Sequence, residues 1–274
     1  MSSWVGESGI CTIFAPPRTG KTALLTTIGN HYAFDRERNK YQRLEINKLN
    51  AGGFNIEYPR HCVRANYKIN FRKFGYSLRP SRKFKPFHFG YKNSQVDVQF
   101  VTPYDILLVT EGQKYFNSRK SKNYPAWQSR AMEQIGHNNL LLFIDVQRPN
   151  LIDVNIRELS KFIEVVSLNM KCDENGKINK MVWVLKLIDN SFLLDKYLGS
   201  GKTLEVPTVK MSIDYNVFML YQSKCCQPRF FDGHFNDSPD ESVYPDIEPT
   251  VESFKEYLLE FAEDEIPKGF YEKE

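Results

Sequence analysis

The stretch Ala15-Pro16-Pro17-Arg18-Thr19-Gly20-Lys21-Thr22 decides the fold, because it has the composition and spacing of a phosphate-binding loop. The apolar run Ile10 to Phe14 before it predicts a short buried strand. The run Ala23 to Ile28 after it predicts the apolar start of a helix that continues to about Ala33. In a strand–loop–helix context, backbone N–H groups and the helix N-terminus can surround a phosphate. The sequence therefore predicts a nucleotide pocket at this loop.

Individual roles follow from the chemistry of such loops. Lys21 is expected to reach the β- and γ-oxygens of ATP, and the Thr22 hydroxyl is expected to ligate Mg²⁺. Alanine stands at the first loop position, where glycine is usual, so that residue must avoid a conformation that only glycine tolerates. A second Gly-Lys-Thr, within residues 199–203, has no strand directly before it and is predicted to be an ordinary loop. The expected nucleotide-binding residues are Ala15, Pro16, Pro17, Arg18, Thr19, Gly20, Lys21, Thr22 and Ala23.

Length and composition fit one large α/β domain with insertions, or one core plus a small appendage, since the chain has 274 residues of which 41% are hydrophobic. The N-terminus lacks a signal pattern, and no window approaches the roughly 18 to 20 apolar residues of a membrane span. We therefore expect a cytoplasmic protein. Five cysteines form no CxxC pair and predict neither a disulfide framework nor a zinc site.

Charge is segregated along the chain although the net charge is only +4. Residues 60–92 contain ten Lys or Arg and no acid, whereas residues 232–274 contain fourteen acids and three bases. We expect a P-loop ATPase domain over residues 1–231, with a basic aromatic insertion at 71–93. The acidic tail, 232–274, is expected to contain a helix at 251–262, where aromatic and acidic residues fall on opposite faces.

Further apolar segments predict a parallel sheet. The strands Tyr104 to Thr110 and Leu140 to Asp145 are separated by the helix-compatible segment 127–136, and both are followed by polar residues. Together with the first strand, they predict a mostly parallel sheet with the site along one edge. Residues 162–170 and 179–188 flank an Asn-Gly turn and predict a β-hairpin. Residues 62–71, 96–101 and 217–221 are also predicted to be strands.

The second half of the site requires carboxylates at a strand end beside the loop, one for the attacking water and one for the Mg²⁺ shell. Glu111 follows one predicted strand and Asp145 ends the next, but Thr110 stands where an acid is expected before Glu111. In one interpretation, Asp145 marks the metal-binding strand and Glu111 is incidental. In the other, Glu111 is catalytic, Gln147 senses the γ-phosphate and Asp145 substitutes across the sheet for the acid missing at 110. We prefer the second interpretation because one strand is followed by Glu-x-Gln and the next by Gln-Arg-Pro.

Those residues carry a resemblance to a known family. The chain resembles the zonular occludens toxin-like ATPases, a branch of the FtsK/HerA-type DNA pumps and filamentous-phage assembly ATPases, over roughly residues 10–223. Besides the loop, the matching elements are Leu108 to Phe116, Gly136-His137, Gln147-Arg148-Pro149, Ile152-Asp153, Ile156 to Leu159 and Val217 to Ser223.

The resemblance implies a three-layer RecA-like sheet with an additional catalytic-Glu strand between the two Walker elements. It also implies Mg²⁺-dependent ATP hydrolysis and assembly into homo-oligomeric rings, in which Arg157 or Arg148 touches the γ-phosphate of a neighbouring subunit. His137 is expected to be structural.

Two functions stay open on the sequence. In residues 71–92, Lys and Arg alternate with aromatic residues, a composition suited to single strands or to a phosphate backbone. The aromatic residues could instead pack on the core, or the insertion could dock on the acidic tail of an adjacent subunit. The chain is thus either a motor ATPase of phage or mobile-element origin, for DNA packaging or virion assembly, or a nucleotide-switched assembly factor that recruits coat or membrane partners. Thr110 leaves a binding-only switch open.

Overall fold

The computed structural model describes residues 4, 6–59, 61–67, 69–73, 76–80, 82–84, 86, 101–118, 126–172, 174 and 178–213. Their centre is an eight-stranded sheet with the order β10-β9-β8-β1-β7-β6-β2-β5. The six strands from β8 to β5 are parallel, and β9 and β10 extend the sheet in antiparallel fashion. The strands are β1 (Gly9–Phe14), β2 (Val63–Ala65), β5 (Arg82–Lys83), β6 (Ile106–Val109), β7 (Leu141–Val146), β8 (Ser160–Cys172), β9 (Ile178–Ile188) and β10 (Thr208–Ile213).

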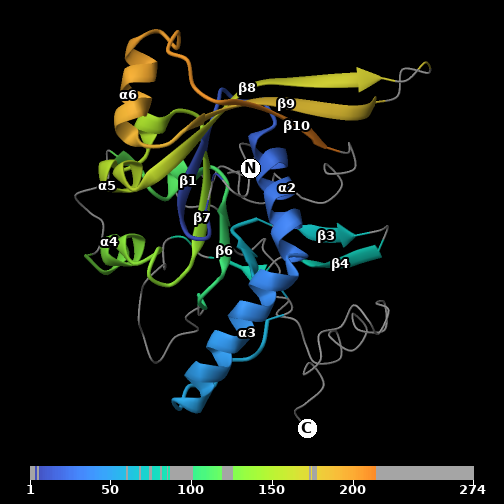
Figure 1. The fold of residues 1–274 in the computed structure, drawn as a ribbon, viewed down its shortest axis with the longest axis vertical. Coiled ribbons are helices and arrows are strands. Elements are labelled where there is room, and N and C mark those ends of the chain that lie inside the picture. Colours follow the sequence, from blue (N-terminus) through green and yellow to red (C-terminus); the bar gives the residue numbers. More distant parts are fainter. Residues whose placement is uncertain are drawn as a thin grey trace, which may run out of the picture.

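Helices cover both faces of this sheet, which gives the predicted three-layer α/β fold (Figure 1). Helix α2 (Lys21–Ala33) packs on one face, in a core that it shares with the inward side chains of β1, β2 and β9. Gly29 lets α2 lie close to β6, because a Cβ at this position would be 2.4 Å from Leu108 Cδ1. The opposite face packs under α4 (Ala126–Glu133), α5 (Val154–Glu158) and α6 (Ser191–Gly199).

Helix α3 (Arg36–Ala51) was not predicted, because its buried positions are mostly polar. Arg38, Gln42 and Ile46 are its buried residues, at the four-residue spacing of one helix face. Asp35 caps the helix by accepting from Arg38 N at 3.0 Å. The Arg38 guanidinium donates to three carbonyls beside the amino ends of β1, β6 and β7, which belong to Glu7, Tyr104 and Asn139. A charged helix thereby contacts the amino ends of these three strands, at the end of the sheet opposite the phosphate loop.

The remaining predictions fared unevenly. The β-hairpin is confirmed as β8 and β9, whereas segment 62–71 is not one strand but β2 and the start of a small antiparallel sheet. That sheet consists of β3 (Asn70–Lys73) and β4 (Tyr76–Pro80), which lie within the basic segment. The predicted strand at 96–101 lies outside the described residues except for Val101, which is not in a strand, and the predicted strand at 217–221 and the acidic tail lie wholly outside them. Among the described helices, none is long and apolar enough to cross a membrane.

Candidate nucleotide-binding site

The predicted phosphate loop joins the carboxyl end of β1 to the amino end of α2. Gly20 has φ +81°, and a Cβ there would lie 3.1 Å from Leu168 Cδ2 and 3.2 Å from Trp183 Nε1. Glycine is therefore required both by the backbone conformation and by the close approach of the β8–β9 hairpin. Ala15 does not have a positive φ, so the usual first glycine is dispensable here. Its N–H donates to Val146 O at 3.3 Å, which ties the loop to β7.

Lys21 lies folded over the loop. Its Nζ donates to Pro16 O at 3.0 Å, and Thr19 Oγ1 donates to the same carbonyl at 2.9 Å. Burial lowers the pKa of Lys21, while the charges of Asp145 and Glu111 act in the opposite direction. The ammonium group is thus within electrostatic reach of both predicted acids.

Asp145 is the centre of a hydrogen-bond network at the end of β7. Its Oδ2 accepts from Thr22 Oγ1 at 3.1 Å and from Thr110 Oγ1 at 2.9 Å, and its Oδ1 accepts from Glu111 N at 2.9 Å. Burial raises the pKa of Asp145 to about 6, although the bond from Glu111 N opposes this shift. Thr110, which stands in place of an acid, therefore directs its hydroxyl to the acid on the neighbouring strand. That Asp145 substitutes for the missing acid stays a prediction.

Glu111 follows β6 in a left-handed backbone conformation, with φ 55° and ψ 44°. Its carboxylate accepts from Gln113 Nε2. The next residue, Gly112, packs so closely on β7 that a Cβ would lie 2.1 Å from Ile144 Cγ2. The chain must therefore leave β6 at this point in a sharp turn, which keeps Glu111 beside Asp145.

One expectation about strand order needs correction. The resemblance implied a catalytic-Glu strand between the two Walker elements, but the strand between β1 and β6 is β7, which carries Asp145. Glu111 follows β6, one strand further from the loop. The strand pairing places β7 between β1 and β6, because Phe14 of β1 lies opposite Val146 of β7 and Val109 of β6 lies opposite Ile144 of β7.

Gln147 and Arg157 lie at opposite ends of the parallel strands, Gln147 at the carboxyl end and Arg157 at the amino end. Gln147 is half-buried and directly follows Val146, whose carbonyl accepts from the first loop residue. Arg157 precedes β8, whose first residue, Ser160, lies opposite Ile10 at the amino end of β1. Arg157 is therefore not brought to the loop of its own chain, and only its contact with a neighbouring subunit stays a prediction. Arg148 is exposed and next to Gln147.

Asn66 is a site residue that sequence reasoning missed. It is 6% exposed at the carboxyl end of β2, and its side-chain amide bonds both backbone groups of Thr110. Next to it, the Tyr67 hydroxyl lies 3.1 Å from Thr26 Oγ1, and Thr26 Oγ1 donates to Thr22 O at 2.8 Å. The available signal was a polar residue at the end of a short strand, in a segment that was predicted to be one longer strand.

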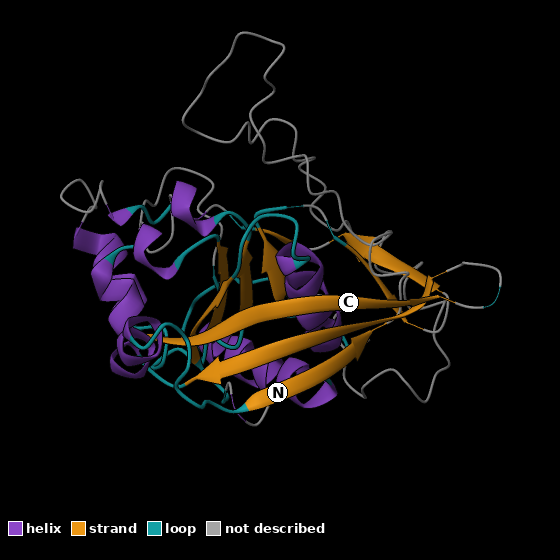
Figure 2. Ribbon diagram, turned by 90° about the horizontal axis from the view of Figure 1, so that it is seen from above, coloured by secondary structure: helices purple, strands orange, loops and turns teal. Residues whose placement is uncertain are grey.

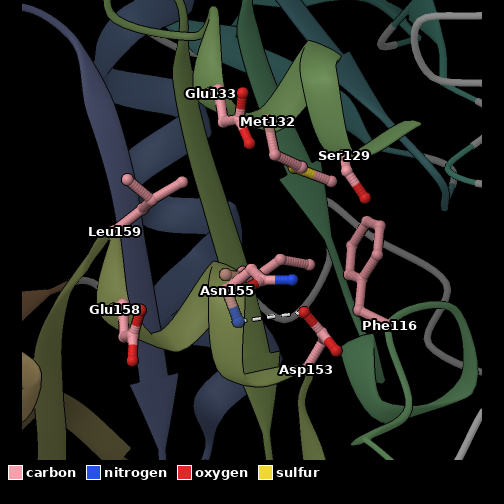
Figure 3. Close-up of a pocket in the computed structure, with 9 residues that line it drawn as sticks. Phe116, Ser129, Met132, Glu133, Asp153, Asn155, Glu158 and Leu159 are labelled. Carbon is pink, nitrogen blue, oxygen red and sulfur yellow. Dashed lines mark hydrogen bonds between the residues drawn. The ribbon is translucent and has the colours of Figure 1, made fainter. Parts of the chain in front are cut away.

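A separate pocket of about 160 Å³ lies away from these residues, between α4, α5 and the segment after β6 (Figure 3). Apolar side chains from Phe116, Met132, Ile156 and Leu159 meet the acids Glu133, Asp153 and Glu158 there. The Asp153 carboxylate already accepts from Asn155 N at 2.9 Å and caps α5. The pocket therefore belongs to the packing of the helical layer rather than to the phosphate loop.

The described residues form an α/β fold of the RecA-like type, in which the predicted phosphate loop joins β1 to α2. No family model and no curated protein sequence matches the chain. Among solved structures, it is similar to the N-terminal domain of zonular occludens toxin from Neisseria meningitidis, with 18% identity and a TM-score of 0.47 over 79% of this chain and 100% of that one. It is also similar to the genome packaging NTPase of Sulfolobus turreted icosahedral virus 2 in complex with ATP-gammaS, with 10% identity and a TM-score of 0.35 over 68% and 98%.

Proposed function

We propose that the chain binds Mg·ATP at residues 15–23 and hydrolyses it. The observation that carries this proposal is the network in which Thr22, Thr110 and Glu111 N all bond Asp145 beside Lys21. A loop lysine, a loop hydroxyl, a buried acid at the end of one strand and a second acid after the neighbouring strand are groups that phosphoryl transfer uses.

Each group has a role in this proposal. Lys21 neutralises charge on the β- and γ-phosphates, Glu111 orients the attacking water, and Gln147 senses the γ-phosphate. The Thr22 hydroxyl and the Asp145 carboxylate provide the hard oxygen ligands that suit Mg²⁺. A bound Mg²⁺ would supply positive charge to offset the negative charge that develops on the phosphates. No three acidic, histidine or cysteine side chains gather as a metal site in the described part of the chain.

The biological setting follows from the motif resemblance stated above. We propose a ring-forming motor of phage or mobile-element origin that acts in DNA packaging or virion assembly in the cytoplasm. The basic segment 71–92 would contact DNA, and Arg148 or Arg157 would contact the nucleotide of the neighbouring subunit. The strand β2 leads from the site directly into this segment, since β3 begins at Asn70.

A second candidate function is a nucleotide-switched assembly factor with little hydrolysis. The observation that favours it is Thr110, which replaces an acid and leaves Asp145 as the buried carboxylate nearest to Thr22. In that case nucleotide binding would control oligomerisation, and coat partners rather than DNA would respond.

The first prediction tests turnover. We expect ATP hydrolysis by the full chain that single- or double-stranded DNA stimulates, loss of nucleotide binding in Lys21→Ala, and retained binding in Glu111→Gln. Turnover by Glu111→Gln should fall by roughly 10²- to 10⁴-fold, since the group that orients water loses its charge. Steady-state phosphate release and equilibrium dialysis measure the two quantities. Lys202→Ala, in the second Gly-Lys-Thr, is the matched control and should bind normally.

Three outcomes separate the candidates. Turnover that is indifferent to DNA, together with nucleotide-dependent oligomerisation, favours the assembly factor. Binding without turnover in the wild type favours the switch. Absence of nucleotide uptake by the wild-type chain would remove both.

A further inference from the structure

The side chain of Asn66 pairs with the backbone of Thr110 as if it were a residue of a neighbouring strand. Its Nδ2 donates to Thr110 O at 3.1 Å, and Thr110 N donates to its Oδ1 at 2.9 Å. The backbone N–H of Asn66 continues the parallel ladder of β2 by donating to Leu108 O at 3.1 Å. Asn66 therefore lengthens the hold of a three-residue strand on β6 to the point where the acids of the site begin.

This pairing places the peptide group between Thr110 and Glu111 in a clamp. On one side, its carbonyl accepts from Asn66, and on the other side, its N–H donates to Asp145 Oδ1 at 2.9 Å. The clamp comes directly before Glu111, whose φ of 55° lies in the left-handed region that residues other than glycine rarely adopt. Such a conformation persists only where the surroundings impose it, and it is most frequent at functional sites.

We propose that Asn66 is a positioning residue for hydrolysis, which fixes the peptide before Glu111 and so aims the Glu111 carboxylate at the attacking water. The inference rests on the proposed ATPase function and names a residue outside the predicted set. Asn66 acts through the backbone of Thr110 and does not contact the nucleotide. Its loss therefore lowers the rate of the chemical step and leaves the affinity for Mg·ATP unchanged.

The chain offers a matched control for this side chain. Asn50, in the last turn of α3, makes the same two bonds with the backbone of Ile56, at 3.0 Å from its Nδ2 to the carbonyl oxygen and at 2.8 Å from the Ile56 N–H to its Oδ1. Helix α3 begins beside the amino ends of β1, β6 and β7, whereas the phosphate loop lies at the carboxyl end of β1. Asn50→Ala removes an equivalent pair of bonds without touching the site.

The experiment compares Asn66→Ala, Asn66→Asp and Asn50→Ala in the full chain. Aspartate has the size of asparagine and accepts from Thr110 N, but its carboxylate cannot donate to Thr110 O. We expect kcat to fall about 10- to 100-fold in both Asn66 variants, with a dissociation constant for Mg·ATP within about twofold of the wild type. Amide hydrogen exchange at Glu111 should accelerate about tenfold or more in these variants. Asn50→Ala should leave kcat, the dissociation constant for Mg·ATP and amide exchange at Glu111 unchanged.

Each result decides the inference. Wild-type turnover and wild-type exchange at Glu111 in a folded Asn66 variant would overturn it. A loss of nucleotide affinity equal to the loss in kcat would also overturn it, since that result indicates general disruption of the pocket. If the wild type binds nucleotide but does not hydrolyse it, accelerated exchange at Glu111 in Asn66→Asp still supports the clamp, and only the ATPase proposal fails.

Discussion

In the folded protein, the Asp145 carboxylate loses its contact with water and accepts hydrogen bonds from two hydroxyl groups and one backbone amide instead. This burial costs free energy, because it disfavours the charged form of the group. The residue is 1% exposed, and burial raises the pKa of its carboxyl group to about 6. A carboxylate with that environment weakens the fold at neutral pH by roughly 2 to 3 kcal/mol relative to its protonated form. The protein thus carries an acid at a position where a neutral side chain would be more stable.

Asp145→Asn should separate function from stability. We expect Mg²⁺-dependent hydrolysis to fall at least as far as in Thr110→Ala, because the variant loses the charge nearest to Thr22. Stability should respond in the opposite sense. The pKa in the folded state is raised, so the stabilising contribution of the protonated form is complete below the unfolded pKa and is lost as the pH rises through about 6.

The measurement is urea denaturation of both proteins in metal-free buffer at pH 5 and pH 8. The free energy of unfolding of Asp145→Asn, relative to the wild type, should rise by on the order of 1 kcal/mol between the two values. A difference that does not depend on pH would show that Asp145 is not protonated in this range. Unchanged hydrolysis would exclude the cross-sheet substitution.

Residues with a fixed place in a local motif could be predicted from the sequence, and residues recruited by tertiary contacts could not. The spacing of the loop predicted where Lys21 and Thr22 begin the helix after β1, because that placement depends only on the strand–loop–helix unit. Asn66 reaches the backbone of Thr110 because β2 pairs with β6 so that Ala65 lies opposite Leu108, and that register is not visible in a single sequence. The place of Arg157 was equally hidden, since it depends on where β8 starts.

Among the elements, the β8–β9 hairpin has the largest reach. Phe14 ends β1 opposite Glu164, but β8 continues to Cys172, so the hairpin extends past the central strands (Figure 2). Leu168 and Trp183 are paired in this extension and contact the position of Gly20. The hairpin itself was predictable from its alternation and its Asn-Gly turn. Its contact with the loop depends on relative strand lengths and therefore was not.

Helix α6 explains why the second Gly-Lys-Thr differs from the first. The helix ends at Gly199, and Lys202 reaches back to Glu164, which also accepts from the Tyr197 hydroxyl. Glu164 is 6% exposed, so its charge needs these partners. The sequence analysis made no prediction for residues 191–198, and its prediction of a loop at 199–203 agrees with a helix that ends at Gly199.

Lys202→Met should therefore be a stability variant only. We expect a loss of about 1 kcal/mol in the free energy of unfolding, since Lys202 is half-exposed and Tyr197 still bonds the acid. Urea denaturation measures this loss, and titration with Mg·ATP should give the wild-type affinity. A marked fall in affinity at unchanged stability would instead place a phosphate contact in this loop.

At the scale of the whole molecule, the site lies at the carboxyl edge of six parallel strands. From β1 the chain passes through α2 and α3 to β2 on one side, whereas β8 joins β1 on the other side. Crevices at the carboxyl ends of parallel strands are the usual ligand sites of open α/β sheets. This architecture could be predicted, because three apolar strands with polar residues at their ends already implied it. The antiparallel extension by β10 could not, because its alternation is short.

Ligand linkage gives a prediction for the whole chain. A ligand that binds only the folded state at 100 times its dissociation constant adds about 2.7 kcal/mol. For a domain of this size, Mg·ATP should raise the melting temperature by about 5 to 10 °C. Differential scanning fluorimetry measures the shift, and Lys21→Ala should show none. An equal shift in Lys21→Ala would place the nucleotide away from the loop.

The bond from Lys21 to Pro16 O has one more consequence. An arriving anion must exchange places with a peptide oxygen that is already within reach of the ammonium, so a weakly held or poorly shaped anion gains little by displacing it. We therefore expect the loop to bind small inorganic anions weakly. A polyphosphate that bonds the backbone amides as well as the lysine should bind with higher affinity.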